Sequence, residues 1–312
     1  MLRSFTQAIF LYIALAVQGI AIHAQAAEAP KVVASIKPLH SLVSAVMDGV
    51  GVPALIVEGT GSPHAYALKP SQATTLQQAD AVFWIGEGLE NFLVKPLSTL
   101  SNNASIIALV KVPGVELLKV KEADPGEPAE TKDHDHSHGA MDMHLWLDPQ
   151  NAKAMTVAIA DALSKKDPAN QQAYQANAVA ATKRLDALST DMATLLGPEK
   201  GKPFVMFHDG YQYFEARFGL EEAGSIVLNP DVPPSAERIK AIRQKVQKSG
   251  AVCIFSEPQF EPRIIQTVVE GTGAKTAALD PLGADIPAGP DQYFQMLQNM
   301  GTSFAKCMSS KS

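Results

Sequence analysis

The stretch ANQQAYQANAVAATKRLDALSTDMATLL, residues 169–196, decides the fold. Its apolar residues recur at alternating spacings of four and three, which places them along one face of an α-helix. The stripe consists of Tyr174, Ala178, Ala181, Leu185, Leu188, Met192 and Leu195. A helix of this length extends about 40 Å. It is long enough to run past two lobes, so we predict that residues 169–199 form a linking helix.

Short apolar runs alternate with helical segments on both sides of this helix. Before it, runs that predict strands lie at 31–36, 53–59, 81–86 and 105–110. After it, similar runs lie at 203–208, 223–228, 251–257 and 275–281. The runs lack polar alternation, which is typical of parallel sheets covered by helices on both faces. We therefore predict an α/β fold with two Rossmann-like lobes, residues 27–168 and 200–312, each holding a parallel sheet and joined by the long helix.

Capping residues predict where three of the helices begin. Asp148 before Pro149 combines an N-cap residue with proline at the first helical position. Ser71, which follows Pro70, and Ser235 are expected to cap two further helices.

Composition and charge exclude some classes of partner. The chain has 312 residues, 46% of them hydrophobic, which is ample for sizeable cores. It has 26 Lys and Arg against 32 Asp and Glu, a formal net charge of −6, and no long basic block. Because phosphate binding needs clustered positive charge, we do not expect a nucleic-acid partner.

The N-terminal residues have the pattern of a secretory signal. An apolar run extends from Ala8 to Ile22, and the small-x-small sequence AQA follows at 24–26. We predict a signal peptide at 1–26 and a mature protein in the bacterial periplasm or outside the cell. The alternative, an uncleaved membrane anchor, is less favoured because the run is short for a full span.

Two cysteines, Cys253 and Cys307, lie in the exported part of the chain. An even count in an oxidising compartment favours a disulfide, which would tie the last helix to the sheet. The alternative is a pair of buried free thiols.

Three histidines lie where strands or ordered segments lead into helices. His64 and His208 follow predicted strands of different lobes, and His144 precedes the helix that starts after Asp148. Ligands of parallel α/β sheets collect at the carboxyl ends of strands, and three imidazoles with a water or carboxylate would suit zinc. A single histidine in such a place is more often a cap or a hydrogen-bonded core residue.

Residues 121–139, KEADPGEPAETKDHDHSHG, have no large apolar side chain, and we expect a disordered surface loop. It contains His134, His136 and His138 alternating with Asp133 and Asp135. Such a tract can bind zinc weakly and raise its concentration near a site. The alternative is a solubilising insert with incidental metal affinity.

Five motifs together resemble the zinc-binding proteins of bacterial ABC importers, the ZnuA-type branch of the metal-specific solute-binding proteins. They are TGSPHAYALKPSQ (60–72), MHLWLDP (143–149), FVMFHDGYQYF (204–214), FSEPQF (255–260) and LDPLG (279–283). The resemblance spans nearly the whole mature chain. It implies a monomeric receptor with two lobes bridged by a rigid helix, a Cys253–Cys307 disulfide, and an inner-membrane permease with its ATPase as partners. It also implies Zn²⁺ held between the lobes by His64, His144 and His208.

The chain departs from the family pattern at Pro63. Some members have a glutamate ligand at this position, immediately before the first histidine, and proline cannot replace it. The fourth ligand would then be water or Asp280, which matches an aspartate ligand in metal-binding relatives but is equally expected to cap its own turn. Glu257 is expected to hydrogen-bond an imidazole ligand, and Asp209 to do the same or to cap a helix.

Two other functions remain open from the sequence. A Mn²⁺ or Fe²⁺ receptor of the same family is one, although relatives that bind manganese carry an acidic residue in place of His208. A zinc hydrolase with Glu257 as general base is the other, but neither an HExxH nor a GxSxG motif occurs.

Overall fold

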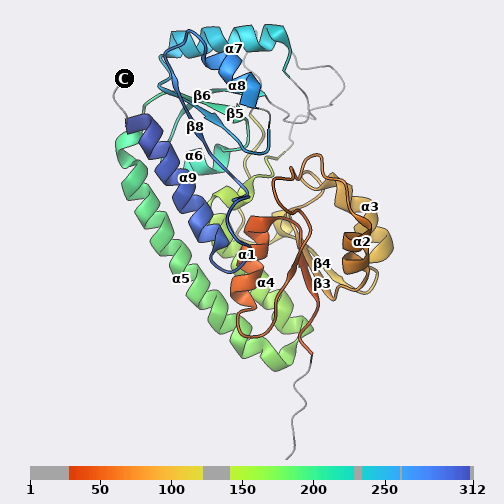
Figure 1. Cartoon of the computed structure of the whole chain (residues 1–312). Coiled ribbons are helices and arrows are strands. Elements are labelled where there is room, and N and C mark those ends of the chain that lie inside the picture. The colour runs from red at the N-terminus through yellow and green to blue at the C-terminus, as the bar shows by residue number, and fades with distance from the viewer. Residues whose placement is uncertain (1–27, 122–140, 228–233, 261, 310–312) are drawn as a thin grey trace, which may run out of the picture.

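The computed structural model describes residues 28–121, 141–227, 234–260 and 262–309 (Figure 1). The first parallel sheet has the strand order β2-β1-β3-β4. Its strands are β1 (Val32–Ala34), β2 (Ala54–Leu55), β3 (Ala81–Trp84) and β4 (Ser105–Ala108). The second parallel sheet has the order β6-β5-β7-β8. Its strands are β5 (Phe204–His208), β6 (Glu222–Val227), β7 (Cys253–Ser256) and β8 (Lys275–Ala278). The predicted fold class is confirmed.

Helices surround both sheets. Those that accompany the first sheet are α1 (Lys37–Val46), α2 (Pro70–Gln77), α3 (Asn91–Leu100) and α4 (Pro149–Lys166). Those that accompany the second are α6 (Gln212–Phe218), α7 (Ala236–Ser249), α8 (Pro262–Val269) and α9 (Gln292–Ser309). Short 3-10 turns lie at Leu109–Lys111, Leu145–Leu147, Pro168–Asn170 and Gly197–Glu199. In the described part of the chain, no helix is both long and apolar enough to cross a bilayer.

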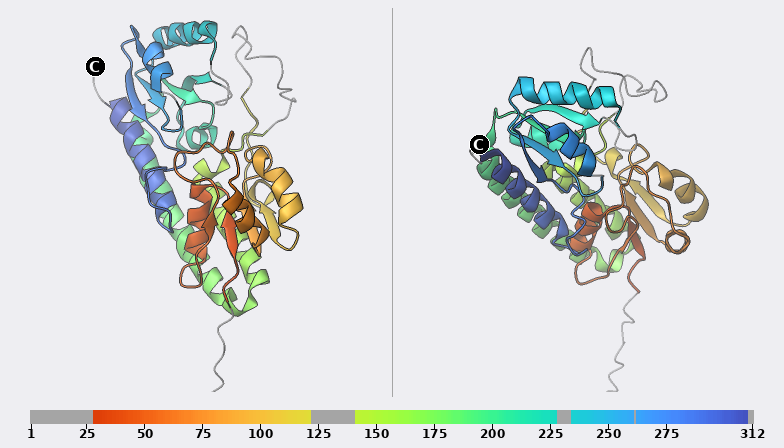
Figure 2. Two further views of the ribbon diagram at one scale, coloured as in Figure 1. Left: turned by 45° about the vertical axis from the view of Figure 1, so that its right-hand side comes forward. Right: turned by 45° about the horizontal axis from the view of Figure 1, so that its top comes forward.

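The long helix α5 (Gln171–Leu196) runs along one side of both lobes (Figures 1 and 2). Its predicted apolar face is buried up to Met192, but the last position is wrong. Leu195 is 40% exposed, whereas Leu196 is fully buried. A spacing of four from Met192 suits the 3.6-residue period as well as a spacing of three, so periodicity alone did not choose between them.

Helix α9 lies beside α5, begins next to α1 and runs from there back toward the second sheet (Figure 2). A Cβ atom at Gly301 of α9 would come within 2.3 Å of the Met192 methyl group, so glycine permits this close approach. Helix α9 belongs by sequence to the second lobe but also contacts α1 of the first. The predicted lobe boundaries at 168 and 200 therefore stay a prediction.

Two of the three predicted caps are confirmed. Asp148 accepts a hydrogen bond from the Gln150 amide, and Ser235 accepts one from the Arg238 amide. The Ser71 cap is wrong, because α2 begins at Pro70 and Lys69 is its N-cap. Proline suits the first helical position, which leaves Ser71 inside the first turn. The predicted signal peptide and residues 122–139 of the predicted loop, with its histidines, lie outside the described residues.

The predicted disulfide is confirmed: Cys253 of β7 is bonded to Cys307 of α9, with Cα atoms 6.1 Å apart. Replacing both cysteines by serine should lower the free energy of unfolding by about 4 kcal/mol, because the bond closes a loop that spans 54 residues. Guanidinium chloride unfolding measures this, with the reduced natural protein as the control for loss of the bond. An unchanged unfolding midpoint would show that the bond does not stabilise the fold.

Candidate metal centre

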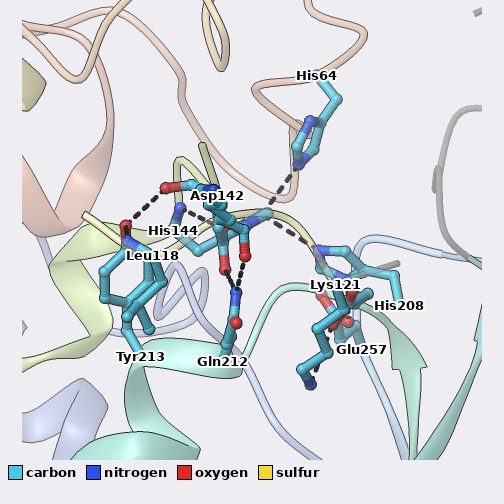
Figure 3. Close-up of polar contacts among 11 residues, drawn as sticks. His64, Leu118, Lys121, Asp142, His144, His208, Gln212, Tyr213 and Glu257 are labelled. Atoms are coloured by element: carbon cyan, nitrogen blue, oxygen red, sulfur yellow. Dashed lines mark hydrogen bonds and ion pairs between the residues drawn. The ribbon is translucent and has the colours of Figure 1, made fainter. Parts of the chain in front are cut away.

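The three predicted histidines converge, although they come from distant parts of the chain (Figure 3). His64 lies in the loop between β2 and α2, His144 immediately precedes the turn at Leu145–Leu147, and His208 ends β5. The Nε2 atom of His144 lies 3.2 Å from Nε2 of His64 and 3.2 Å from Nε2 of His208. Two nitrogens bound to one tetrahedral Zn²⁺ at about 2.0–2.1 Å would be separated by about 3.3 Å. The spacing of these nitrogens therefore fits one shared ion.

Glu257 orients the His208 ring. Strands β5 and β7 are parallel and pair Val205 with Ile254, so three residues further on His208 and Glu257 meet. Glu257 Oε1 lies 2.5 Å from His208 Nδ1, and both residues are buried. Burial would lower the pKa of His208, but the Glu257 carboxylate outweighs it and raises that pKa. With Nδ1–H donated to Glu257, Nε2 is the atom left for a metal.

Asp142 does the same for His144, a role that the sequence pattern did not predict. Asp142 Oδ1 accepts hydrogen bonds from His144 Nδ1 at 2.8 Å and from its backbone amide at 2.9 Å. Burial favours the neutral form of Asp142, but the charge and hydrogen bonds of His144 lower its pKa overall. An aspartate two residues before a histidine is a weak sequence pattern, because it requires a tight turn to bring the two side chains together.

His64 is held differently. Among the described residues, its ring nitrogens have one polar partner, the Nε2 atom of His144. Burial and the neighbouring His144 and His208 rings lower its pKa well below the ordinary value, so the ring stays neutral near pH 7. A neutral imidazole is ready to bind a cation without first losing a proton.

The pocket around the three rings is lined by Pro63, Trp146, Gln259, Phe260 and Leu282, among others. Asp280 does not belong to the converging group. Its carboxylate accepts hydrogen bonds from the amides of Leu282, Gly283 and Ala284 and from the Gln259 side chain. This is the turn-capping role expected as the alternative for Asp280.

Asp209 points to a different group from its neighbour His208. Its Oδ1 atom lies 3.2 Å from the Lys121 ammonium, which also contacts Glu215 and Glu222. The three carboxylates are nearly buried and share this one cation. Burial and the charge of Glu215 raise the pKa of Glu222 to about 8, so the cluster retains a proton near neutral pH.

Gly210 also belongs to the site, and the sequence pattern did not predict this. A Cβ atom at this position would lie 2.3 Å from Nε2 of His208. The glycine therefore keeps this nitrogen accessible.

A model of the ZnuA family, described as the periplasmic component A of zinc-uptake complexes, matches residues 32–307. The chain belongs to the ZnuA family. It is 45% identical over 311 residues to the high-affinity zinc uptake system protein ZnuA of Brucella suis biovar 1, covering 91% of this chain and 93% of that protein. This confirms the resemblance seen in the five motifs.

Two solved structures share the fold. A crystal structure of ZnuA matches with a TM-score of 0.76 at 24% identity, covering 90% of this chain and 99% of that one. The solute-binding protein FpvC of Pseudomonas aeruginosa, solved in complex with Mn²⁺, matches with a TM-score of 0.76 at 21% identity, covering 90% and 98% of the two chains.

Substituting Gly210 by alanine should weaken metal binding at least tenfold, because the added Cβ would displace the His208 ring, and disturbing the orientation of a ligand costs about 10–100-fold in affinity. Gly210 does not have a positive φ, so the clash with the His208 ring is the main effect. A chelator competition titration measures the affinity. Gly197→Ala is the matched control, because nothing lies within 4 Å of its added Cβ and its φ is also negative. Equal affinity in both variants would contradict this role of Gly210.

Substituting Glu222 by glutamine should flatten the pH dependence of stability between about pH 4.5 and 8. Because its folded pKa is raised from 4.5 to about 8, the native state binds the proton more tightly than the unfolded chain does, and stability falls as the pH rises through this range. Over this pH range the free energy of unfolding of the natural protein should fall by roughly a few kcal/mol. Urea unfolding from pH 5 to 9 measures it, with the exposed Glu237→Gln as control. The same pH slope in wild type and Glu222→Gln would refute this assignment.

Proposed function

We propose that this protein is a periplasmic receptor that binds one Zn²⁺ at His64, His144 and His208 and delivers it to an ABC importer. The observation that carries the proposal is the convergence of three imidazole nitrogens at the spacing of one tetrahedral ion, in a chain of the ZnuA family. The partners would be an inner-membrane permease and its ATPase. The receptor would act as a monomer after removal of a signal peptide at 1–26.

Water is the proposed fourth ligand. Pro63 has no donor atom, and the Asp280 oxygens already accept four hydrogen bonds. Moving Asp280 to the metal would leave three backbone amides and the Gln259 amide without their acceptor, at a cost of about 1–3 kcal/mol for each buried donor. Asp280 would instead shape the turn beside the site.

The donor set favours zinc over manganese. FpvC shares the fold and was solved with Mn²⁺, so the fold alone does not select the ion. Selection must then come from the ligands, and imidazole suits Zn²⁺ whereas Mn²⁺ prefers oxygen.

A zinc hydrolase is less well supported than a receptor. The reaction would need Glu257 as a free general base near a metal-bound water. Glu257 Oε1 is instead bonded to His208 Nδ1, where it orients a ligand. We therefore propose that the protein carries out no bond-making chemistry. Whether His134, His136 and His138, with Asp133 and Asp135, capture metal for the site stays a prediction.

Calorimetric titration of the metal-free protein should find one tight Zn²⁺ per chain. A 100-fold excess of Mn²⁺ should leave most of the Zn²⁺ bound, because three imidazole ligands rank Zn²⁺ well above Mn²⁺. Displacement of Zn²⁺ by comparable concentrations of Mn²⁺ would favour the manganese alternative. Turnover of ester or peptide substrates by the zinc form would instead favour the hydrolase.

A further inference from the structure

We propose that the three ligands act as a pair and a single closing ligand, an inference that rests on the proposed zinc site. His144 and His208 would form a prebuilt pair, with Asp142, Gln212 and Tyr213 as positioning residues that secure His144. His64 would close the site and leave first when the ion is released.

By sequence, His64 and His144 both precede α5, whereas His208 follows it. The hydrogen bonds of residues 142–148 instead group His144 with His208. Tyr213 of α6 donates from its hydroxyl to the backbone oxygen of Asp142 at 2.8 Å, and Gln212 donates to Asp142 Oδ2 at 3.4 Å. Arg217, also of α6, binds both carboxylate oxygens of Asp148 at 2.6 Å. The segment that carries His144 is thus tied at both ends to the helix that follows His208.

The middle of this segment is tied to the C-terminal part of the chain as well. Trp146 Nε1 donates to the backbone oxygen of Pro281 at 2.8 Å, and the Tyr293 hydroxyl donates to the backbone oxygen of Trp146 at 2.7 Å. These groups are buried, so each bond is shielded from water. His144 and His208 are therefore held in one frame before any ion binds.

The chain just before residue 122 strengthens this frame. Tyr213 accepts a hydrogen bond from the Leu118 amide, and Gln212 donates to the Lys119 oxygen as well as to Asp142 (Figure 3). The Lys121 ammonium lies 2.8 Å from Glu215, again on α6.

The loop that carries His64 is held by the first lobe and not by this frame. At its start the loop is tied to the first sheet, because the Ile56 and Val57 amides donate to the oxygens of Ala34 and Ser35. Further along, Tyr66 donates from its hydroxyl to the Ile56 oxygen, Gln72 donates to Tyr66, and the Tyr66 ring packs against Phe92. The Tyr66 ring lies against Gly61, where a Cβ atom would be 2.9 Å away. Residues 58–60 are exposed. Among the described residues, the hydrogen bond that leaves this loop toward the site is His64 Nε2 to His144 Nε2.

Because His144 and His208 are oriented by carboxylates and His64 is not, we expect the three ligands to contribute unequally to metal affinity. Removing His64 leaves two imidazoles that are both oriented by carboxylates. Removing His144 or His208 leaves His64, whose ring has no orienting carboxylate among the described residues, beside a single oriented ring. Orienting partners of this kind change metal affinity by about 10–100-fold.

Zn²⁺ affinities and dissociation rates of His64→Ala, His144→Ala and His208→Ala test the inference by chelator competition and stopped flow. His64→Ala should bind at least tenfold more tightly than either other variant and should still take up Co²⁺ with a visible d–d spectrum. Equal losses in all three would overturn the pair-plus-one division but leave the zinc site intact. No loss in any variant would overturn the proposed function itself.

Gln212→Ala tests the positioning residues, because Gln212 does not reach the ion. It should raise the rate of Zn²⁺ release by up to about tenfold. Gln175→Ala is the matched control, since it also removes a glutamine hydrogen bond to an aspartate, Asp161, at 3.0 Å, but between α4 and α5. An unchanged release rate in Gln212→Ala would overturn its role.

Hydrogen exchange keeps the inference testable if a variant fails to fold. In the natural protein, Zn²⁺ should increase amide protection chiefly in residues 59–68, whereas residues 142–148 should be protected already. A larger gain in residues 142–148 than in 59–68 would overturn the inference.

Discussion

Two buried imidazoles each donate a hydrogen bond from Nδ1 to a carboxylate, and the geometry of the site depends on these two bonds. Glu257 holds His208, and Asp142 holds His144. A neutral imidazole has one N–H and one lone pair, so fixing the hydrogen at Nδ1 places the lone pair at Nε2. The two Nε2 atoms then face each other at 3.2 Å, which is favourable only if a cation or a proton lies between them.

The fold supplies both carboxylates by different means. Glu257 reaches His208 through the register of two parallel strands, which is fixed along their whole pairing. Asp142 reaches His144 within a short turn, and that turn needs outside support from α6. The disulfide between β7 and α9 adds a covalent tie to the strand that leads to Glu257. The sheet therefore orients one of these two imidazoles, and side-chain hydrogen bonds orient the other.

The sequence was most informative where structure depends on local periodicity. The long helix, both parallel sheets, and the Asp148 and Ser235 caps followed from spacing and from capping residues. The end of the helical stripe was wrong, because Leu195 and Leu196 fit the period almost equally well and only their burial in the folded chain distinguishes them. Motifs singled out His64, His144, His208 and Glu257, which the structure brings together. Gly210 and Asp142 were missed, since their roles depend on distances that one-dimensional patterns do not contain.

Under the proposed zinc binding, charge balance explains why the site can do without an acidic ligand at position 63. Zn²⁺ would bring two positive charges into the pocket, and the three imidazoles are neutral once they bind it. Asp142 and Glu257 provide two negative charges, one behind each of two ligand rings, so the assembled site is neutral overall. A carboxylate beside His64 would add a third negative charge and would bind the ion through oxygen, which hard cations prefer. With proline at position 63, selection between metal ions is left to the nitrogen donors. The loop that carries His64 positions this ring without adding a charge.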